Sequence, residues 1–280
     1  MKKIGLVFLT GVFALGLTAC GGQKMKMPKF EMPEVHLEER PEIRVQKRIA
    51  RILAAEDEVE YLKEVADLVQ LGRDVKWDHG KLLDTVIDYA AVLEDKPETV
   101  GRYSRLLATL NIPRSAIVGA AAGRLDGEGR PAAVSRQLLR MAAPPDPKGR
   151  VDFSHFRQYL EAHRTQPPKS LVLWMYQLDP ASAMWEILAI QGQPADRDAV
   201  ATSEHAISEV LWRSERNLLP NDKLLTAAAD QLDALSQSKA WPVRLYVAET
   251  LAQQPKLRKP ALVERLKRDE SDLVKAAMGM

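Results

Sequence analysis

Residues 241–252 read Trp-Pro-Val-Arg-Leu-Tyr-Val-Ala-Glu-Thr-Leu-Ala, and residues 272–277 read Asp-Leu-Val-Lys-Ala-Ala. In the first stretch Val243, Val247 and Leu251 recur at four-residue steps, which places them on one face of an α-helix. The second stretch begins the pattern again, with Val274 31 residues after Val243. A pattern that returns at this spacing predicts stacked helical units.

The pattern is similar to that of HEAT repeats, in which Val-Arg is followed by small or apolar residues at four- and seven- or eight-residue steps. The resemblance covers about 40 residues, and Trp241-Pro242 stands where the family commonly has Asp before Val-Arg. Membership would imply that the apolar residues face the core between helices and that the arginine ties neighbouring turns together. The implied repeat-core or interaction residues are Val243, Arg244, Val247, Leu251 and Val274.

The chain from residue 84 onward divides into helices of about three turns, most of them opened by a capping residue or an early proline. Aromatic residues make up only 6%, and runs that favour strands are scarce. We therefore expect an all-α fold, either a HEAT-like α-solenoid or an irregular helical bundle. The expected helices are Asp84–Glu94, Glu98–Leu110, Pro113–Leu125, Pro131–Met141, Phe153–His163, Lys169–Leu178, Pro180–Ile190, Asp196–Trp212, Asn221–Ser236, Pro242–Gln253, Pro260–Lys267 and a last helix from Asp272.

Three prolines within Ala142–Gly149 exclude a helix there. We expect residues 144–150 to form a Pro-rich linker between an N-terminal helical region, 41–143, and a C-terminal HEAT-like region, 151–280.

Between Glu42 and Gly72 apolar residues recur at three- and four-residue steps with charges between them. This predicts one long amphipathic helix that can break near Glu56-Asp57-Glu58, followed by a turn at Trp77–Lys81. The apolar stripe must be buried, and packing on the helical body is favoured over a coiled coil because the run is short and irregular. The stripe consists of Ile43, Ile49, Ile52, Leu53, Val59, Leu62, Val65, Ala66 and Val69.

The amino terminus has a basic start, an apolar run from Ile4 to Leu17, and the tetrapeptide Leu17-Thr18-Ala19-Cys20. This is the arrangement of a secretory signal, and the run is shorter than the roughly 20 residues of a membrane-spanning helix. The tetrapeptide resembles the lipobox of bacterial lipoproteins. The resemblance implies diacylglycerol on the Cys20 thiol, cleavage before Cys20, and usually a third acyl chain on the new amino terminus.

Residues 1–19 are thus an expected signal peptide, and residues 20–40 an expected lipidated cysteine with a disordered, flexible tether. Prolines and the lack of a helical period in residues 21–40 predict an extended segment. Its lysines Lys24, Lys26 and Lys29 either form part of a solvated linker or each add about 1 kcal/mol of attraction to an anionic membrane. Gly21 is not the aspartate that commonly retains enterobacterial lipoproteins in the inner membrane. The resemblance therefore implies the outer membrane, facing the periplasm.

Net charge and cysteine content exclude two kinds of function, nucleic-acid binding and thiol chemistry. Without Lys2 and Lys3, the remaining 38 basic residues balance the 38 acidic ones, so no global field attracts nucleic acid. Cys20 is the single cysteine, and its lipidation leaves no thiol for a disulfide or a nucleophile.

Motifs for catalysis and metal binding are incomplete. Ser236 and Lys239 have the Ser-x-x-Lys spacing of penicillin-recognising enzymes, but the companion Lys-Thr-Gly motif is missing, so we expect a helix end there. His205 and Glu209 share a helix face, although a zinc site needs at least a third ligand. We expect no catalytic residue, no metal ligand and no cofactor.

The sequence therefore predicts a membrane-anchored, non-enzymatic scaffold of the bacterial cell envelope. Its expected partners are the membrane, through lipid on Cys20, and an unidentified envelope protein, through an extended helical surface. Two alternatives stay open. One is an envelope hydrolase whose active site is assembled from residues distant in sequence, and the other is a carrier of a hydrophobic ligand.

Overall fold

The computed structural model describes residues 40–74, 78–93, 97–127, 129–147, 149–192, 197–216 and 222–279. The expected signal peptide, Cys20 and all of the expected tether except Arg40 lie outside these ranges. Residues 39–280 form one compact unit, to which the following description applies.

The described residues have an all-α fold, as the composition predicts. The bridge between Pro145 and Val151 is isolated, outside any strand. Two helices, Lys169–Leu178 and Pro260–Lys267, have the same first and last residues as predicted from the sequence. The elements are α1 (Pro41–Ala54), α2 (Glu58–Asp74), α3 (His79–Val92), α4 (Pro97–Thr109), α5 (Arg114–Ala122), α6 (Arg130–Ala142), η1 (Ser154–Phe156), α7 (Arg157–Ala162), α8 (Lys169–Leu178), α9 (Pro180–Gln191), α10 (Arg197–Glu215), α11 (Asp222–Leu235), α12 (Trp241–Gln253), η2 (Pro255–Leu257), α13 (Pro260–Lys267) and α14 (Asp272–Ala277).

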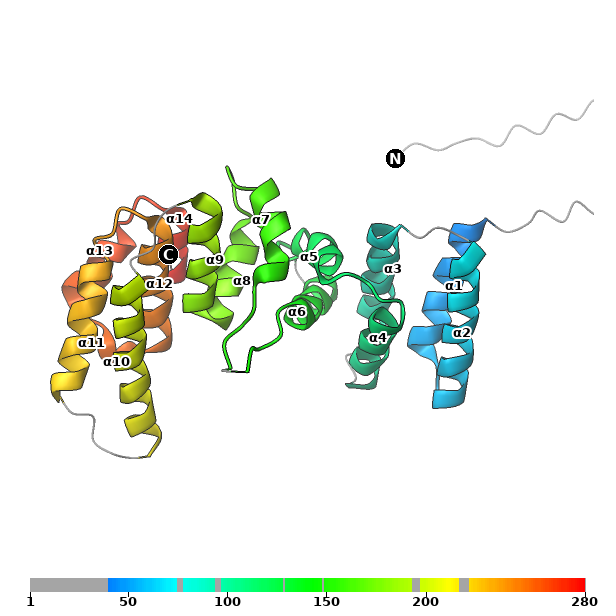
Figure 1. Ribbon diagram of the computed structural model, residues 1–280, viewed down its shortest axis with the longest axis horizontal. Coiled ribbons are helices and arrows are strands. Elements are labelled where there is room, and N and C mark those ends of the chain that lie inside the picture. The colour runs from blue at the N-terminus through cyan, green and yellow to red at the C-terminus, as the bar shows by residue number, and fades with distance from the viewer. Residues whose placement is uncertain are drawn as a thin grey trace, which may run out of the picture. The chain divides into compact units, whose positions relative to one another are not determined.

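Between Glu42 and Gly72 the chain forms two helices, and the break between them falls at residues 55–57, where the sequence allows one near Glu56-Asp57-Glu58. Asp57 Oδ1 accepts a hydrogen bond from the backbone N–H of Glu60 at 2.8 Å, and Glu60 Oε2 accepts one from the N–H of Glu56 at 2.9 Å. This reciprocal capping satisfies donors that the start of α2 leaves unpaired. The chain reverses there, and α1 and α2 lie side by side as a hairpin (Figure 1).

A turn is expected at Trp77–Lys81, but its last three residues, His79 to Lys81, are helical. Helix α3 begins at His79 because Asp78 caps it, its Oδ1 accepting from the N–H groups of Gly80 at 3.0 Å and Lys81 at 3.3 Å. Gly80 and Lys81 therefore belong to the first turn of a helix.

Helices that follow one another in sequence pack on one another. The pairs α1–α2, α5–α6, α8–α9 and α10–α11 are in contact (Figure 1). Helix α3 joins α1 to α5 and α6, and α5 in turn contacts η1 and α7. One cluster of buried apolar side chains extends from Ile49 in α1 to Val274 in α14. This arrangement is compatible with stacked helical repeats.

Helix α12 is the most enclosed element among the described residues. Every residue from Pro242 to Leu251 is buried, and the helix contacts α8, α9, α11, α13 and α14. A helix enclosed on all sides has no solvent face for its polar residues, so each of them needs a partner inside the protein.

Arg244 is the polar residue of α12 with the most contacts. Its Nε donates to Asp269 Oδ2 at 2.7 Å and its NH2 donates to Asp269 Oδ1 at 3.0 Å, so the pair is bidentate. The same side chain donates to the carbonyls of Ser238 and Lys239 at 2.8 and 3.1 Å and to Glu270 at 2.9 Å. Arg244 thereby ties the start of α12 to the turn between α13 and α14.

Replacing Arg244 by methionine should destabilise the fold by about 3–5 kcal/mol, because Asp269 would stay buried without its counter-charge. The side chains of the pair are only 9% and 6% exposed. Adding Asp269→Asn to Arg244→Met should cost less than the sum of the two single changes, with a coupling of about 1–3 kcal/mol. Urea unfolding of the four proteins measures this, and additive effects would show that the pair does not act as a unit.

Candidate functional site

The five repeat-core or interaction candidates all lie in the interior. Val247, Leu251 and Val274 have no exposed surface, while Val243 and Arg244 are 6% and 7% exposed. The guanidinium of Arg244 is occupied by carboxylates and carbonyls of the chain itself. These residues hold the helices together. They are not accessible to a binding partner. Cys20, the expected lipidation site, lies outside the described residues.

The residues that suggested chemistry in the sequence also have contacts within the chain. Ser236 Oγ donates to the carbonyl of Asp233 at 2.6 Å and accepts from Arg265 at 2.6 Å, just after the end of α11. Glu209 forms an ion pair with Arg213, one turn further along α10, at 2.8 Å. Among the described residues no group of three or more His, Cys, Asp or Glu side chains is arranged to hold a metal ion.

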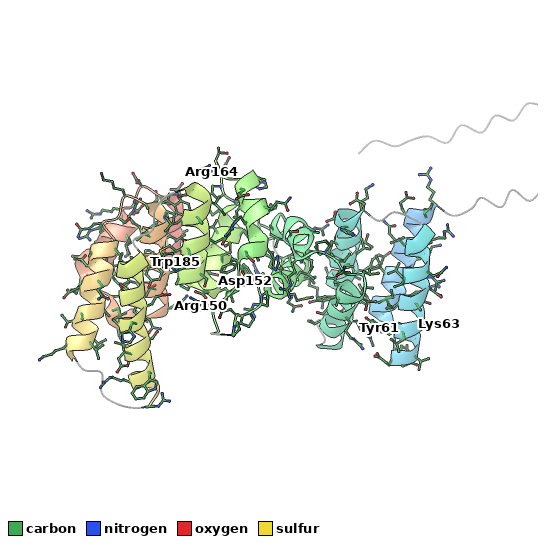
Figure 2. All side chains as sticks on the ribbon, in the orientation of Figure 1. Tyr61, Lys63, Arg150, Asp152, Arg164 and Trp185 are labelled. Carbon is green, nitrogen blue, oxygen red and sulfur yellow. The ribbon has the colours of Figure 1, made fainter. Side chains whose placement is uncertain are left out.

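A polar depression of about 360 Å³ lies beside the loop 144–152, and Arg150 and Asp152 on its wall are labelled in Figure 2. Ser182 also lines it, and the Ser182 hydroxyl donates to Asp179 Oδ2 at 2.8 Å. Asp179 accepts further bonds from the N–H groups of Val151 at 3.0 Å and Ser182 at 3.1 Å. The oxygens of Asp179 are thus occupied by hydrogen bonds at the start of α9, and the geometry is that of a helix cap.

Two glutamates of the described helices have perturbed ionisation. Burial raises the pKa of Glu204 in α10, the negative charge of Asp179 raises it further, and Arg150 acts in the opposite direction. Burial raises the pKa of Glu249 in α12 to about 7. Glu249 is 4% exposed, and its charge adds to the burial that raises the pKa of Tyr176 well above its ordinary value. A carboxyl group that is part-protonated near neutral pH therefore lies inside the helical body.

The α1–α2 hairpin has a buried side and an exposed side. Leu68 and Val65 of α2 face inward and are buried, and the ring of Tyr61 is held by Arg105 of α4, whose guanidinium carbon lies 4.4 Å from the ring centre. In Figure 2 Tyr61 lies on the side of the hairpin that faces α4. The opposite side of α2 has no helix packed on it among those described, since its main helical contact is with α1.

The outward side of α2 exposes apolar residues next to polar ones such as Lys63, contrary to the expectation that the whole stripe would be buried. Val59 is 78% exposed and Leu62 is 56% exposed, and Ala66 is exposed one turn further on. The cause is the break at residues 55–57, which gives α2 its own helical phase. We call Val59, Leu62 and Ala66 the outer face of α2. Their spacing of three, four and seven residues within α2 alone was the sequence signal for a second apolar face.

Between α1 and α2 lies an open groove of about 470 Å³. Its charged lining is mainly basic and comes from α1, and Asp67 of α2 is its acidic member. We call it the basic groove. Its lining residues are Arg44, Lys47, Arg48, Arg51, Asp67, Gln70 and Leu71.

No protein-family model matches the chain, and no curated protein or solved structure matches it either. Across the described ranges, no helix combines the length and apolar character needed to cross a membrane.

Glu249→Gln should remove part of the pH dependence of stability. Between the ordinary pKa of about 4.5 and the raised value of about 7, the folded protein holds a proton that the unfolded chain releases. Stability from this group is therefore lost as the pH rises through that window. At pH 8 the variant should be more stable than the parent by on the order of 2–3 kcal/mol, with little difference at pH 4.5. Urea unfolding at both pH values measures this, and an equal difference at both would contradict it.

Proposed function

We propose that this chain is a lipid-anchored, non-enzymatic interaction module of the bacterial cell envelope, held at the outer membrane facing the periplasm. The observation that carries the interaction role is the outer face of α2, where Val59 and Leu62 are exposed on a helix that α1 covers from one side. The anchor is supported by the pattern of Lys2, Lys3, the apolar run and Leu17-Thr18-Ala19-Cys20.

The outer face of α2 fits a protein partner because of its spacing. Val59, Leu62 and Ala66 occupy positions i, i+3 and i+7 of one helix, the spacing by which a helix inserts its apolar side into a groove of another protein. Terminal units of helical arrays usually present a polar outer side to water. Full burial of a valine or leucine side chain is worth about 1.5–3 kcal/mol, so covering this face favours association.

The alternatives have less support from the described residues. The apolar depression between α3, α4 and α6 measures about 110 Å³, whereas ligand pockets usually measure about 300–1,000 Å³. This favours an interaction surface over a carrier of a hydrophobic ligand. For a hydrolase, the strongest candidate is Ser182, whose hydroxyl instead contributes to the cap of α9.

Labelling of cells with radioactive palmitate tests the anchor. The parent chain should incorporate label and fractionate with outer membranes, and Cys20→Ala should incorporate none, because the thiol is the acceptor of the diacylglycerol. Persistent label in Cys20→Ala would overturn the lipid anchor. Soluble, unlabelled parent protein would do the same.

Leu62→Glu tests the outer face of α2. The change puts a charge at the centre of the proposed contact, so recovery of a partner from detergent extracts of the envelope should fall at least tenfold, which corresponds to about 1.4 kcal/mol. Folding stability should change by no more than about 0.5 kcal/mol, since the side chain is 56% exposed.

The matched control is Val92→Glu in α3, which changes an equally apolar side chain that is 78% exposed outside the proposed face. The control should recover the partner as the parent does. Equal recovery with Leu62→Glu, or equal loss with both variants, would contradict a role for the outer face of α2.

A further inference from the structure

The basic groove is built by one face of α1. Arg44, Lys47, Arg48 and Arg51 follow one another at steps of three, one and three residues, which brings all four to the same side of a helix. Arg40 precedes Arg44 by four residues and continues the series at the start of α1. The apolar residues of α1 that enter the core, among them Ile49 and Ile52, lie on a different face.

Arg48 forms ion pairs with two acidic side chains of α2 that lie beside the groove. It forms ion pairs with Glu64 at 2.6 Å and Asp67 at 2.8 Å, and the hydrogen bond with Glu64 raises the pKa of Arg48. Arg51 reaches Glu64 only at 3.8 Å, and its side chain is 58% exposed. No carboxylate of the described residues lies within ion-pair distance of Arg44. The three arginines Arg44, Arg48 and Arg51 thus share two carboxylates, and these arginines bring an excess of positive charge to the groove.

Phosphate is the group that this arrangement suits. A guanidinium presents several N–H donors in a planar fork that matches two phosphate oxygens, and Arg44 and Arg51 keep most of their donors available on the open side of the groove. A groove of about 470 Å³ has room for a whole phosphate-bearing headgroup. Because it is open to solvent, a headgroup could enter while remaining attached to a lipid.

Because α1 follows the proposed anchor closely in the chain, a membrane lipid is the favoured source of the phosphate. Pro41 follows Cys20 by 21 positions, and the flexible tether that the sequence predicts would have an end-to-end distance of about 25 Å. An anchor at Cys20 would therefore hold α1 near the headgroups. We propose that the basic groove binds the phosphate-bearing headgroup of an anionic membrane lipid, so that the α1–α2 hairpin lies against the membrane surface. This inference depends on the lipid anchor proposed above.

The test uses the chain from residue 20 onward with Cys20→Ser, which keeps every described residue and has no thiol to lipidate. Binding to vesicles of phosphatidylglycerol and phosphatidylcholine is measured by co-sedimentation, with pure phosphatidylcholine vesicles for comparison. The parent should bind the anionic vesicles and weaken as salt is raised. Arg44→Gln with Arg51→Gln should weaken binding about thirtyfold, or roughly fivefold for each charge. Arg48 is left unchanged because it pairs with Glu64 and Asp67.

The control is Arg136→Gln with Arg140→Gln, which removes two exposed arginines of α6 and changes the net charge by the same amount. The control should bind as the parent does. Equal loss in control and test variants would overturn the groove as the site, and so would unchanged binding of the test variant. Binding of inorganic phosphate by the parent in solution, together with no retention on the anionic vesicles, would overturn a membrane lipid as the occupant. Because this protein carries no lipid, these results are independent of the palmitate labelling, and the two proposals can fail separately.

Discussion

The enclosure of α12 is the constraint from which much of the C-terminal fold follows. Ten consecutive residues, Pro242–Leu251, are buried, so five other helices must surround this one and no face of it can meet water. The two carboxylate oxygens of Asp269 hold the fork of Arg244 at 2.7 and 3.0 Å, which makes a buried arginine compatible with that environment. The turn that carries Asp269 is thereby held against the start of α12, and α14 is positioned to bring Val274 into the same core.

A fold of this kind obtains its stability from packing and from local polar contacts. The only cysteine in the sequence is Cys20, which lies outside the described body, so no disulfide cross-links the helices. The bidentate pair of Arg157 in α7 with Glu186 in α9 joins two helices, with distances of 2.7 and 3.1 Å. Arginine is suited to this role because its fork fixes an orientation as well as a distance. A continuous apolar core supplies the remaining stability.

The sequence predicts the helices well where a proline or a capping residue marks the start. Pro260 begins α13 as expected, and Asp179 with Pro180 begins α9. The possible break near Asp57 is also predicted, and Asp57 and Glu60 form its capping hydrogen bonds. Prediction fails at the surface of α2. Whether Val59 and Leu62 are buried depends on which helices pack beside α2, and a helical period alone does not determine the neighbours.

The α1–α2 hairpin differs from the helices in the middle of the body because fewer helices pack against it. Helices in the middle of the body are covered from several sides, so their apolar residues serve the core. In α2 the inward side already holds Val65 and Leu68, and further apolar residues on the other side add nothing to that core. The outer face of α2 and the basic groove adjoin each other, because Gln70, which lines the groove, lies one turn beyond Ala66 on α2. A protein on the outer face and headgroups in the groove would therefore approach the same hairpin from neighbouring directions.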